Sequence, residues 1–266
     1  MDMNDAYANA AHIEGANAFP GRWASAAAKW REQALSQLDI SYGMHDRQKL
    51  DLFLPDGEPK GLAMFIHGGY WRAFGRKDWS HLAAGCVARD WAVAIPSYRL
   101  APEVRIAEIT QDLVAALHQA AHLFAGPIVV TGHSAGGHLS ARMICKDVGL
   151  EKAVQRRIER VAPISPLSDM RPLIGLDLND DWRLDMAEAE AESVVLSTPI
   201  TGVAIDVWVG ANERPVFLDQ ARWLAEAWDA GLHVEAGKHH FDVIDAMADP
   251  KSAMITSLLR ENWVPT

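Results

Sequence analysis

The chain has 266 residues, of which 49% are hydrophobic and 23% charged, a composition typical of a soluble globular protein. Its formal net charge of −10 argues against nucleic acid or an anionic membrane surface as the main partner. No charged-then-apolar leader and no 18-residue apolar run is visible, so we expect a cytoplasmic protein.

The chain begins with an Ala- and Asn-rich stretch, residues 1–25, which we interpret as a loose helix or an N-terminal arm lying over the body. Apolar spacing from Ser25 to Leu38 predicts an amphipathic helix. Apolar and polar residues then alternate at 39–42 and 49–53. This alternation predicts two half-buried strands joined near Gly43 as an antiparallel hairpin.

From Gly61 onward, short apolar segments alternate with longer segments of helical spacing, which predicts a parallel sheet with helices on both faces. The predicted strands are 62–66, 92–95, 128–131, 161–164, 205–209 and 233–236. The predicted helices are 79–89, 106–123, 138–144, 215–230 and most of the chain after 240. No internal repeat or long linker interrupts the pattern, so we expect one domain over residues 1–266.

An acidic, Ala-rich segment at residues 167–200 does not fit the alternation of strands and helices. We interpret it as a cap of short helices that covers the site and turns its charged faces to solvent. The alternative is an acidic binding patch.

Gly132–Gly136 matches the G-x-S-x-G pattern of a nucleophile elbow. A predicted strand precedes the match and a predicted helix follows it, which is the context that the motif needs. The two glycines leave room for a sharp turn that would expose Ser134 in a strained backbone. Five-residue matches also occur by chance, but these flanking elements favour a catalytic serine.

A serine nucleophile needs a base to take its proton and an acid to orient that base. In folds that use this elbow, the chain order is serine, acid, histidine. His239 and His240 both follow the last predicted strand. Either one can be the base, with the other supporting the loop.

Glu213 is our candidate for the acid, because it lies three residues after Gly210 at the end of a predicted strand. Asp206 lies inside that strand, Asp242 is too near the histidines in sequence, and Asp169 follows an earlier strand. The alternative role for Glu213 is to cap the helix that follows it.

The loop after the strand 62–66 supplies candidate oxyanion-hole donors. Backbone N–H groups of Gly68 and Gly69, with that of Ala135, could surround a tetrahedral oxygen without obstruction by side chains. We interpret His67 as a structural hydrogen-bonding residue, because no partner at suitable spacing points to a metal site.

Together these features resemble the arylformamidase (kynurenine formamidase) group of α/β-hydrolases, which is related to hormone-sensitive-lipase-like carboxylesterases. The resemblance runs from about residue 40 to 245. Its most telling match is Tyr70-Trp71 directly after the glycine pair, where related lipases have small residues. The other matching segments are 42–43, 50–53, 132–139, 167–173, 213–217 and 240–241.

The resemblance implies an α/β-hydrolase fold and a triad of Ser134, Glu213 and His240, with His240 rather than His239 matching the family's histidine segment. Several family members have aspartate where this chain has Glu213, so the identity of the acid is the point of departure. The implied reaction is hydrolysis of N-formyl-L-kynurenine to L-kynurenine and formate, a step of tryptophan breakdown.

The reaction implied by the resemblance has a small-molecule substrate and requires no cofactor or metal. The net charge argues against a nucleic-acid or membrane partner, and a homodimer stays open. Tyr70 and Trp71 lie beside the oxyanion loop and can stack on an aromatic leaving group, or belong to the core. We include His138 with them as a candidate substrate-binding residue.

Two other functions compete with this interpretation. A short-chain carboxylesterase would use the same apparatus on small acyl or aryl esters, which members of the group can also cleave. A ligand receptor that has lost its chemistry is the third alternative, and the complete set of Ser134, Glu213 and His240 argues against it.

Overall fold

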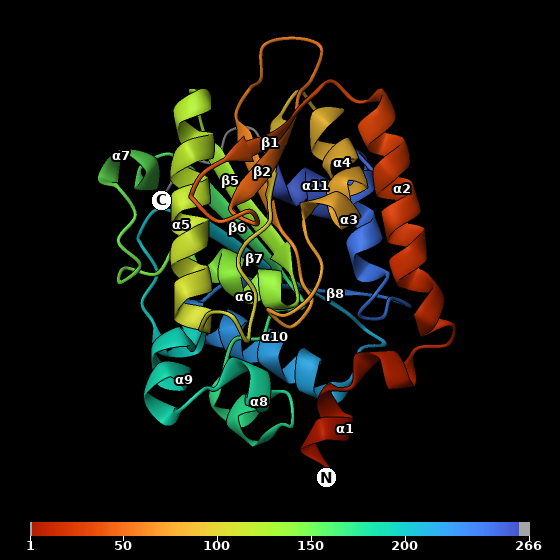
Figure 1. Cartoon of the computed structure of the whole chain (residues 1–266), viewed down its shortest axis with the longest axis vertical. Helices are drawn as coiled ribbons and strands as arrows, with labels where there is room; N and C mark the ends of the chain where they lie inside the picture. Colours follow the sequence, from red (N-terminus) through yellow and green to blue (C-terminus); the bar gives the residue numbers. More distant parts are fainter. Residues whose placement is uncertain (1, 261–266) are drawn as a thin grey trace.

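A mostly parallel sheet of eight strands, with helices on both faces, organises the computed structural model (Figure 1). The structure describes residues 2–260, so Met1 and residues 261–266 of the expected domain lie outside the described residues. Along the sheet the strand order is β1-β2-β4-β3-β5-β6-β7-β8. The strands are β1 (Ser36–Ser41), β2 (Lys49–Phe53), β3 (Leu62–Ile66), β4 (Ala92–Pro96), β5 (Ile128–His133), β6 (Ile158–Ile164), β7 (Ala204–Gly210) and β8 (Gly231–Glu235).

The first two strands form the expected antiparallel hairpin, and β2 also pairs antiparallel with β4. All later neighbours in the sheet are parallel. The prediction of an α/β-hydrolase fold with a mostly parallel sheet and an N-terminal hairpin is therefore confirmed.

Two hydrophobic cores lie on opposite faces of the sheet, because side chains of a strand alternate between its faces. In β3, Leu62, Met64 and Ile66 join one core, whereas Ala63 and Phe65 join the other. Every residue of this strand is buried. Burial on both faces explains why the central strands have nearly continuous apolar sequences.

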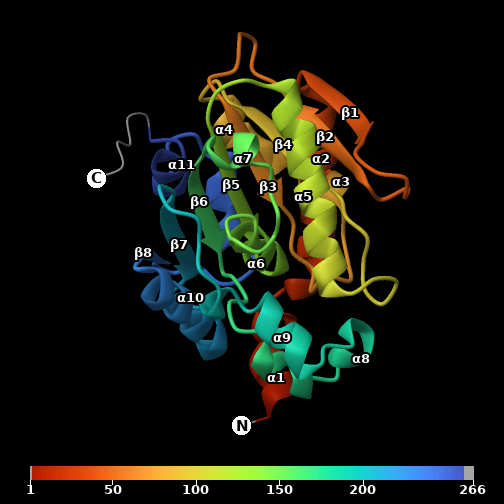
Figure 2. The same cartoon turned by 90° about the vertical axis from the view of Figure 1, so that its left-hand side faces the viewer.

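The helices divide between these two faces (Figures 1 and 2). Residues of α5, α6 and α10 belong to the first core, and residues of α2, α4 and α11 to the second. The helices are α1 (Met3–Tyr7), α2 (Phe19–Gln33), α3 (Arg76–Trp79), α4 (Ala84–Val87), α5 (Ile106–Leu123), α6 (Ala135–Arg142), α7 (Lys152–Gln155), α8 (Asn179–Trp182), α9 (Met186–Glu192), α10 (Pro215–Trp228) and α11 (Ala253–Leu258). Short 3₁₀ segments are η1 (Asn9–His12), η2 (Ala16–Ala18), η3 (Ser80–Ala83), η4 (Arg171–Gly175), η5 (Val194–Leu196) and η6 (Val243–Ala248).

Several of the predicted helices differ from the structure. The helical stretch expected after residue 240 consists of the 3₁₀ segment η6 and the short helix α11, with loops between them. The helix expected over Ser25–Leu38 begins earlier and ends at Gln33, because Ser36 already pairs with Phe53 in the sheet. The helix expected over 79–89 is divided into α3, η3 and α4. In contrast, α5 spans the predicted residues 106–123 without change.

The arm and the cap lie at one end of the sheet. Figures 1 and 2 place α1 beside α8 and α9, below the ends of the central strands. The backbone N–H of Asp177, in the cap, donates to the side chain of Asn4, in the arm, at 2.9 Å. Two segments separated by 173 residues of sequence therefore meet over the same part of the fold. No helix within residues 2–260 has the length and apolar character needed to span a membrane.

Candidate active site

The carboxyl ends of β5, β7 and β8 bring together three residues that are far apart in sequence. Ser134 follows β5, Glu213 follows β7, and His240 lies in the loop after β8. Their exposed fractions are 3%, 6% and 3%. Loops at this edge of a parallel sheet are the usual place for ligand binding in open α/β folds.

Ser134 lies at the turn between β5 and α6 with a φ of 58°, a strained value for a residue with a side chain. The turn is possible only because glycines lie two residues before and two residues after Ser134. A Cβ on Gly132 would lie 2.2 Å from the carbonyl oxygen of Gly136, and a Cβ on Gly136 would lie 2.0 Å from that of Ile66. The local sequence therefore builds the predicted elbow.

The His240 ring and the Glu213 carboxylate form a buried pair, with Nδ1 and Oε2 2.6 Å apart. The other carboxylate oxygen of Glu213 accepts from the Ser165 hydroxyl at 2.5 Å and from the Gly210 backbone N–H at 2.8 Å. These contacts fix the carboxylate on the side of the ring away from Nε2. Such an arrangement can orient a histidine that acts through Nε2.

The alternative acids lie elsewhere. Asp169 pairs with Arg171 in the cap, and Asp206 pairs with His233 at the sheet edge. Asp242 accepts from the backbone N–H of His239 at 2.7 Å, and the His239 ring accepts from the backbone N–H of Phe241 at 3.1 Å. His239 therefore stabilises the loop.

Two aromatic neighbours hold the His240 ring. The ring of Phe217, from α10, lies 4.4 Å away, and that of His133, the residue before the serine, lies 4.6 Å away. Burial, and then the nearby His240, lowers the pKa of His133 well below its ordinary value. His133 is therefore a neutral packing partner at physiological pH.

The glycine loop after β3 packs directly against the serine. A Cβ on Gly68 would lie 3.1 Å from that of Ser134, so only glycine allows this approach. Gly69 has a φ of 109° and lines the cavity beside the serine. Ala135 is the first residue of α6, where a backbone N–H has no partner within the helix.

His67 stabilises this loop through ring stacking and a contact with the loop backbone. Its ring stacks on Tyr98 with centroids 4.3 Å apart, and its Nδ1 lies 2.7 Å from the Gly68 carbonyl oxygen. Burial lowers the pKa of His67 to about 3. The residue is buried and neutral, as expected for a structural group. Within residues 2–260, no group of three or more His, Cys, Asp or Glu side chains is arranged to hold a metal ion.

A cavity of about 730 Å³ contains Ser134 and His240 in its wall. The arm supplies much of the rest of the wall, and the cap supplies a smaller part. The lining residues are Asn4, Tyr7, Ala8, Asn9, Ala10, Ala11, Ala16, Asn17, Pro20, Trp23, Gly69, Tyr70, Phe74, Trp79, His133, Ser134, Leu176, Asp177, Leu178, His240 and Phe241. This volume suits a small aromatic molecule.

The three candidate substrate-binding residues have different positions. Tyr70 lines the cavity, whereas Trp71 and His138 are fully buried and do not. Trp71 packs edge-on against both His138 and Trp182 in the core. The structure therefore brings only Tyr70 to the cavity, because the chain turns sharply between residues 69 and 71.

Contacts with distant residues hold the arm in place. The Tyr70 hydroxyl donates to the Tyr7 carbonyl oxygen at 2.5 Å, and the Gln220 side chain donates to the Tyr7 hydroxyl at 3.0 Å. Arg214 forms an ion pair with Asp5 at 2.8 Å. The arm is thus fixed to the glycine loop after β3 and to α10.

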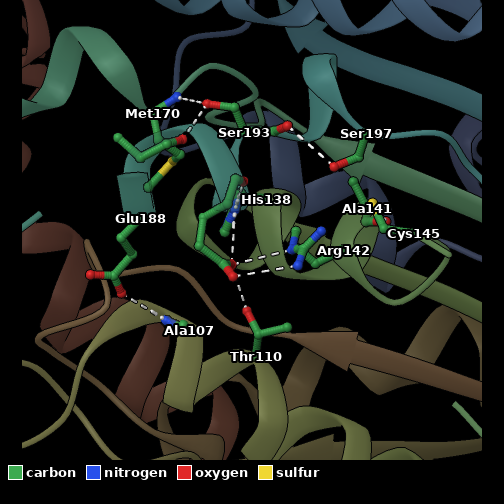
Figure 3. A network of polar contacts seen from close by, with 12 residues as sticks. Ala107, Thr110, His138, Ala141, Arg142, Cys145, Met170, Glu188, Ser193 and Ser197 are labelled. Atoms are coloured by element: carbon green, nitrogen blue, oxygen red, sulfur yellow. Dashed lines mark hydrogen bonds and ion pairs between the residues drawn. The ribbon is translucent and has the colours of Figure 1, made fainter. Parts of the chain in front are cut away.

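A buried polar network attaches the cap to the helix that carries the elbow. Glu192, the last residue of α9, accepts from Thr110 of α5 at 2.8 Å and from Arg142 of α6 at 3.2 Å. The His138 ring lies 2.8 Å from the Glu192 carbonyl oxygen. Figure 3 shows Thr110, His138 and Arg142 converging on this point.

Sequence reasoning did not find Ser165, His133 or the arm as parts of this site. Ser165 directly follows β6, so its place at the carboxyl end of a strand was a usable signal. The arm gave no local signal, since its partners Arg214 and Gln220 are more than two hundred residues away.

Residues 63–239 match the family model described as the alpha/beta hydrolase fold. The chain is also similar to curated kynurenine formamidases. It is 26% identical to the Danio rerio enzyme, over 84% of this chain and 80% of that protein. It is 24% identical to the Drosophila melanogaster enzyme, over 82% and 78%.

Among solved structures, a Silicibacter protein provisionally described as a thioesterase is 52% identical, with a TM-score of 0.95. The similarity covers 97% of this chain and 99% of that one. Esterase B from Lactobacillus rhamnosis has a TM-score of 0.65 at 20% identity, covering 86% and 87%, and shares the fold alone.

Proposed function

This chain belongs to the alpha/beta hydrolase family and is an enzyme of the hydrolase class, and we propose that it removes the formyl group from an aromatic amine, with N-formyl-L-kynurenine as substrate. The observation that carries the proposal is the cavity in which Ser134 and His240 lie beside aromatic side chains. The similarity to kynurenine formamidases over most of the chain supports the same reaction.

In the proposed mechanism, Ser134 is the nucleophile, His240 the general base and Glu213 the orienting acid. Glu213 accepts the Nδ1–H of His240, which leaves the Nε2 lone pair free to take the serine proton. The serine–histidine hydrogen bond in such sites commonly tightens when substrate binds. The Ser134 oxygen then bonds to the formyl carbon.

The negative oxygen that forms in this step needs donors already in place. We assign that role to the backbone N–H groups of Gly68, Gly69 and Ala135. Each such donor contributes about 2.7–4 kcal/mol to the stability of the transition state. The N-terminal end of α6 also favours negative charge beside Ser134.

Collapse of the tetrahedral intermediate breaks the bond between carbon and nitrogen. His240 gives its proton to the departing arylamine, and the formyl group stays on Ser134 as an ester. A water molecule, deprotonated by His240, attacks this ester and releases formate. The proton then returns to the Ser134 oxygen, so that the resting enzyme is regenerated.

The proposal is tested by comparing kcat/KM for N-formylkynurenine with that for short phenyl esters, using wild-type protein and Ser134→Ala. We expect the formamide to be hydrolysed at least as efficiently as the esters, and Ser134→Ala to abolish both activities. If the formamide is hydrolysed orders of magnitude less well than the esters, the formamidase assignment is wrong. If Ser134→Ala retains full activity, the serine mechanism is wrong.

A short-chain carboxylesterase is the second candidate function. The mainly apolar cavity accepts an aryl ester as readily as an aryl formamide, because the proposed chemistry at Ser134 is the same for both. The substrate comparison above separates the two, since an esterase would favour the phenyl esters.

A further inference from the structure

Among the described residues 2–260, the cavity wall that contains Ser134 has no Lys or Arg side chain. In the same part of the chain, Asp177, an exposed residue between η4 and α8, is the only carboxylate of this wall. His133 is neutral because burial holds its pKa far below the ordinary range. A bound molecule therefore meets one negative side chain and no permanent positive one.

Three of the cations in or near the arm and the cap are held in ion pairs. Arg214 pairs with Asp5 at 2.8 Å, Arg171 with Asp169 at 2.7 Å, and Arg72 with Asp181 at 2.9 Å. Moving one of these guanidinium groups toward the cavity would break its ion pair. Arg22, in the arm, lies over the Phe19 ring at 4.6 Å and does not line the cavity. The structure therefore places these four cations outside the wall.

Aromatic rings make up much of the remaining wall. They are contributed by the arm, the oxyanion loop, the following segment and the loop after β8, and they are Tyr7, Trp23, Tyr70, Phe74, Trp79 and Phe241. Aromatic faces carry partial negative charge and attract cations. They give an anionic group nothing to replace the water that it loses on entering.

We propose that Asp177, together with this cation-free aromatic wall, selects leaving groups with a net charge of zero or above, such as zwitterionic L-kynurenine, and disfavours those with a net negative charge. The inference rests on the proposed function for the position of the scissile bond at Ser134. It disfavours acyl carriers that bear phosphates, because such groups would meet Asp177 without a compensating Lys or Arg. The net charge of −10 acts in the same direction at longer range.

The test uses three formanilides that carry methyl, aminomethyl or carboxylate at the same ring position. At pH 7.5 these substituents are neutral, positive and negative. Each kcat/KM is divided by the rate constant for hydroxide hydrolysis, which removes the electronic effect of the substituent. We expect the aminomethyl substrate to equal or exceed the methyl one, and the carboxylate substrate to be about tenfold poorer at low ionic strength.

The role of Asp177 is tested with Asp177→Asn, which keeps the shape and removes the charge. We expect the ratio of kcat/KM for the positive and negative substrates to fall by about three- to tenfold, and added salt to reduce the difference between proteins. The matched control is Asp180→Asn, an exposed carboxylate on α8 that does not line the cavity. This control should leave the ratio unchanged.

The inference is overturned if the carboxylate substrate is hydrolysed as well as the methyl one, or if Asp177→Asn leaves the ratio at the wild-type value. A parallel series of phenyl acetates with the same substituents separates this result from failure of the proposed function. Charge discrimination among the esters, without hydrolysis of the formanilides, would refute the formamidase and support the selectivity.

Discussion

At the scale of single residues, Glu213 and Asp206 are two of the carboxylates that contact a histidine, and of these two histidines only His240, the partner of Glu213, lines the cavity. Glu213 contacts His240, whereas Asp206 contacts His233 at 2.9 Å. Asp206 also accepts from the Ser257 hydroxyl at 2.8 Å, so it links β7 to α11. The chemistry of the two pairs is similar, and their positions give them different roles.

Replacing these two acids by their amides should separate catalysis from stability. Glu213→Gln should lower kcat by about 10²–10⁴-fold, because it no longer orients His240 or stabilises its positive charge. Asp206→Asn should retain kcat and lower the free energy of unfolding by about 1–3 kcal/mol, since it weakens a partly buried hydrogen-bond network. Steady-state kinetics and urea denaturation of both variants give the comparison. A large loss of kcat in Asp206→Asn alone would show that Asp206, and not Glu213, is the catalytic acid.

At the scale of helices and strands, the buried network around Glu192 joins three elements that do not follow one another in sequence. Burial raises the pKa of Glu192, and the nearby Arg142 guanidinium and Thr110 hydroxyl act against this shift. Arg142 also contacts Asp147 at 2.7 Å, at the more exposed side of the network. The buried ion pair between Arg142 and Glu192 is therefore one of several contacts that hold α9 over α5 and α6.

Arg142→Met should destabilise the protein by about 3–5 kcal/mol, because it leaves the Glu192 carboxylate buried without its cation. The double variant Arg142→Met, Glu192→Met should recover much of this loss, since neither charge is then buried. Arg222→Met is the control, because Arg222 forms an exposed ion pair with Asp219 on α10 and should contribute about 0–1 kcal/mol. Urea denaturation of the three variants tests this order. Equal stability of Arg142→Met and Arg222→Met would contradict it.

Local sequence rules predict the strands and helices that are buried or regularly spaced. The strands β3, β4 and β5 have continuous apolar sequences, and α5 has an apolar face along all of its length. The end of α2 was mispredicted, because pairing of β1 with β2 competes with helical spacing over the same residues. Tertiary pairing decided that boundary, and no feature within the segment indicates it.

At the scale of the whole molecule, several buried histidines connect stability to pH. Burial lowers the pKa of His67 and of His138 to about 3. Their pKa in the unfolded chain is about 6.5, so between these values the unfolded state binds more protons than the folded state. Stability is complete above pH 6.5 and decreases as the pH falls toward 3.

The free energy of unfolding should therefore fall between pH 7 and pH 5, with each of these histidines contributing up to about 1.4 kcal/mol per pH unit below pH 6.5. His138→Gln removes one such group and should make the pH dependence shallower. Denaturant titrations at several pH values measure both slopes. A stability that is constant or increases on acidification over this range would show that the histidines are not buried and neutral.

The candidate site was only partly predictable from the sequence, for a reason that belongs to the whole fold. Ser134 follows from a local motif, and Glu213 and His240 follow from the order of strands and from the family resemblance. The part of the cavity wall that the arm supplies depends instead on contacts such as that between Tyr7 and Gln220. Periodicity and short motifs describe only residues that are near one another in sequence, so neither predicts a contact between residues as far apart as Tyr7 and Gln220.

The position of the arm also bears on when activity appears during synthesis. The ribosome produces the arm long before Arg214, Gln220 and His240, the residues that hold it or share the cavity with it. The arm of a nascent chain can therefore meet Tyr70 and Asp177 early, but part of its docking site is missing until α10 and β8 have left the exit tunnel. Completion of the cavity becomes one of the last folding events, and a chain interrupted before residue 214 cannot form the substrate site.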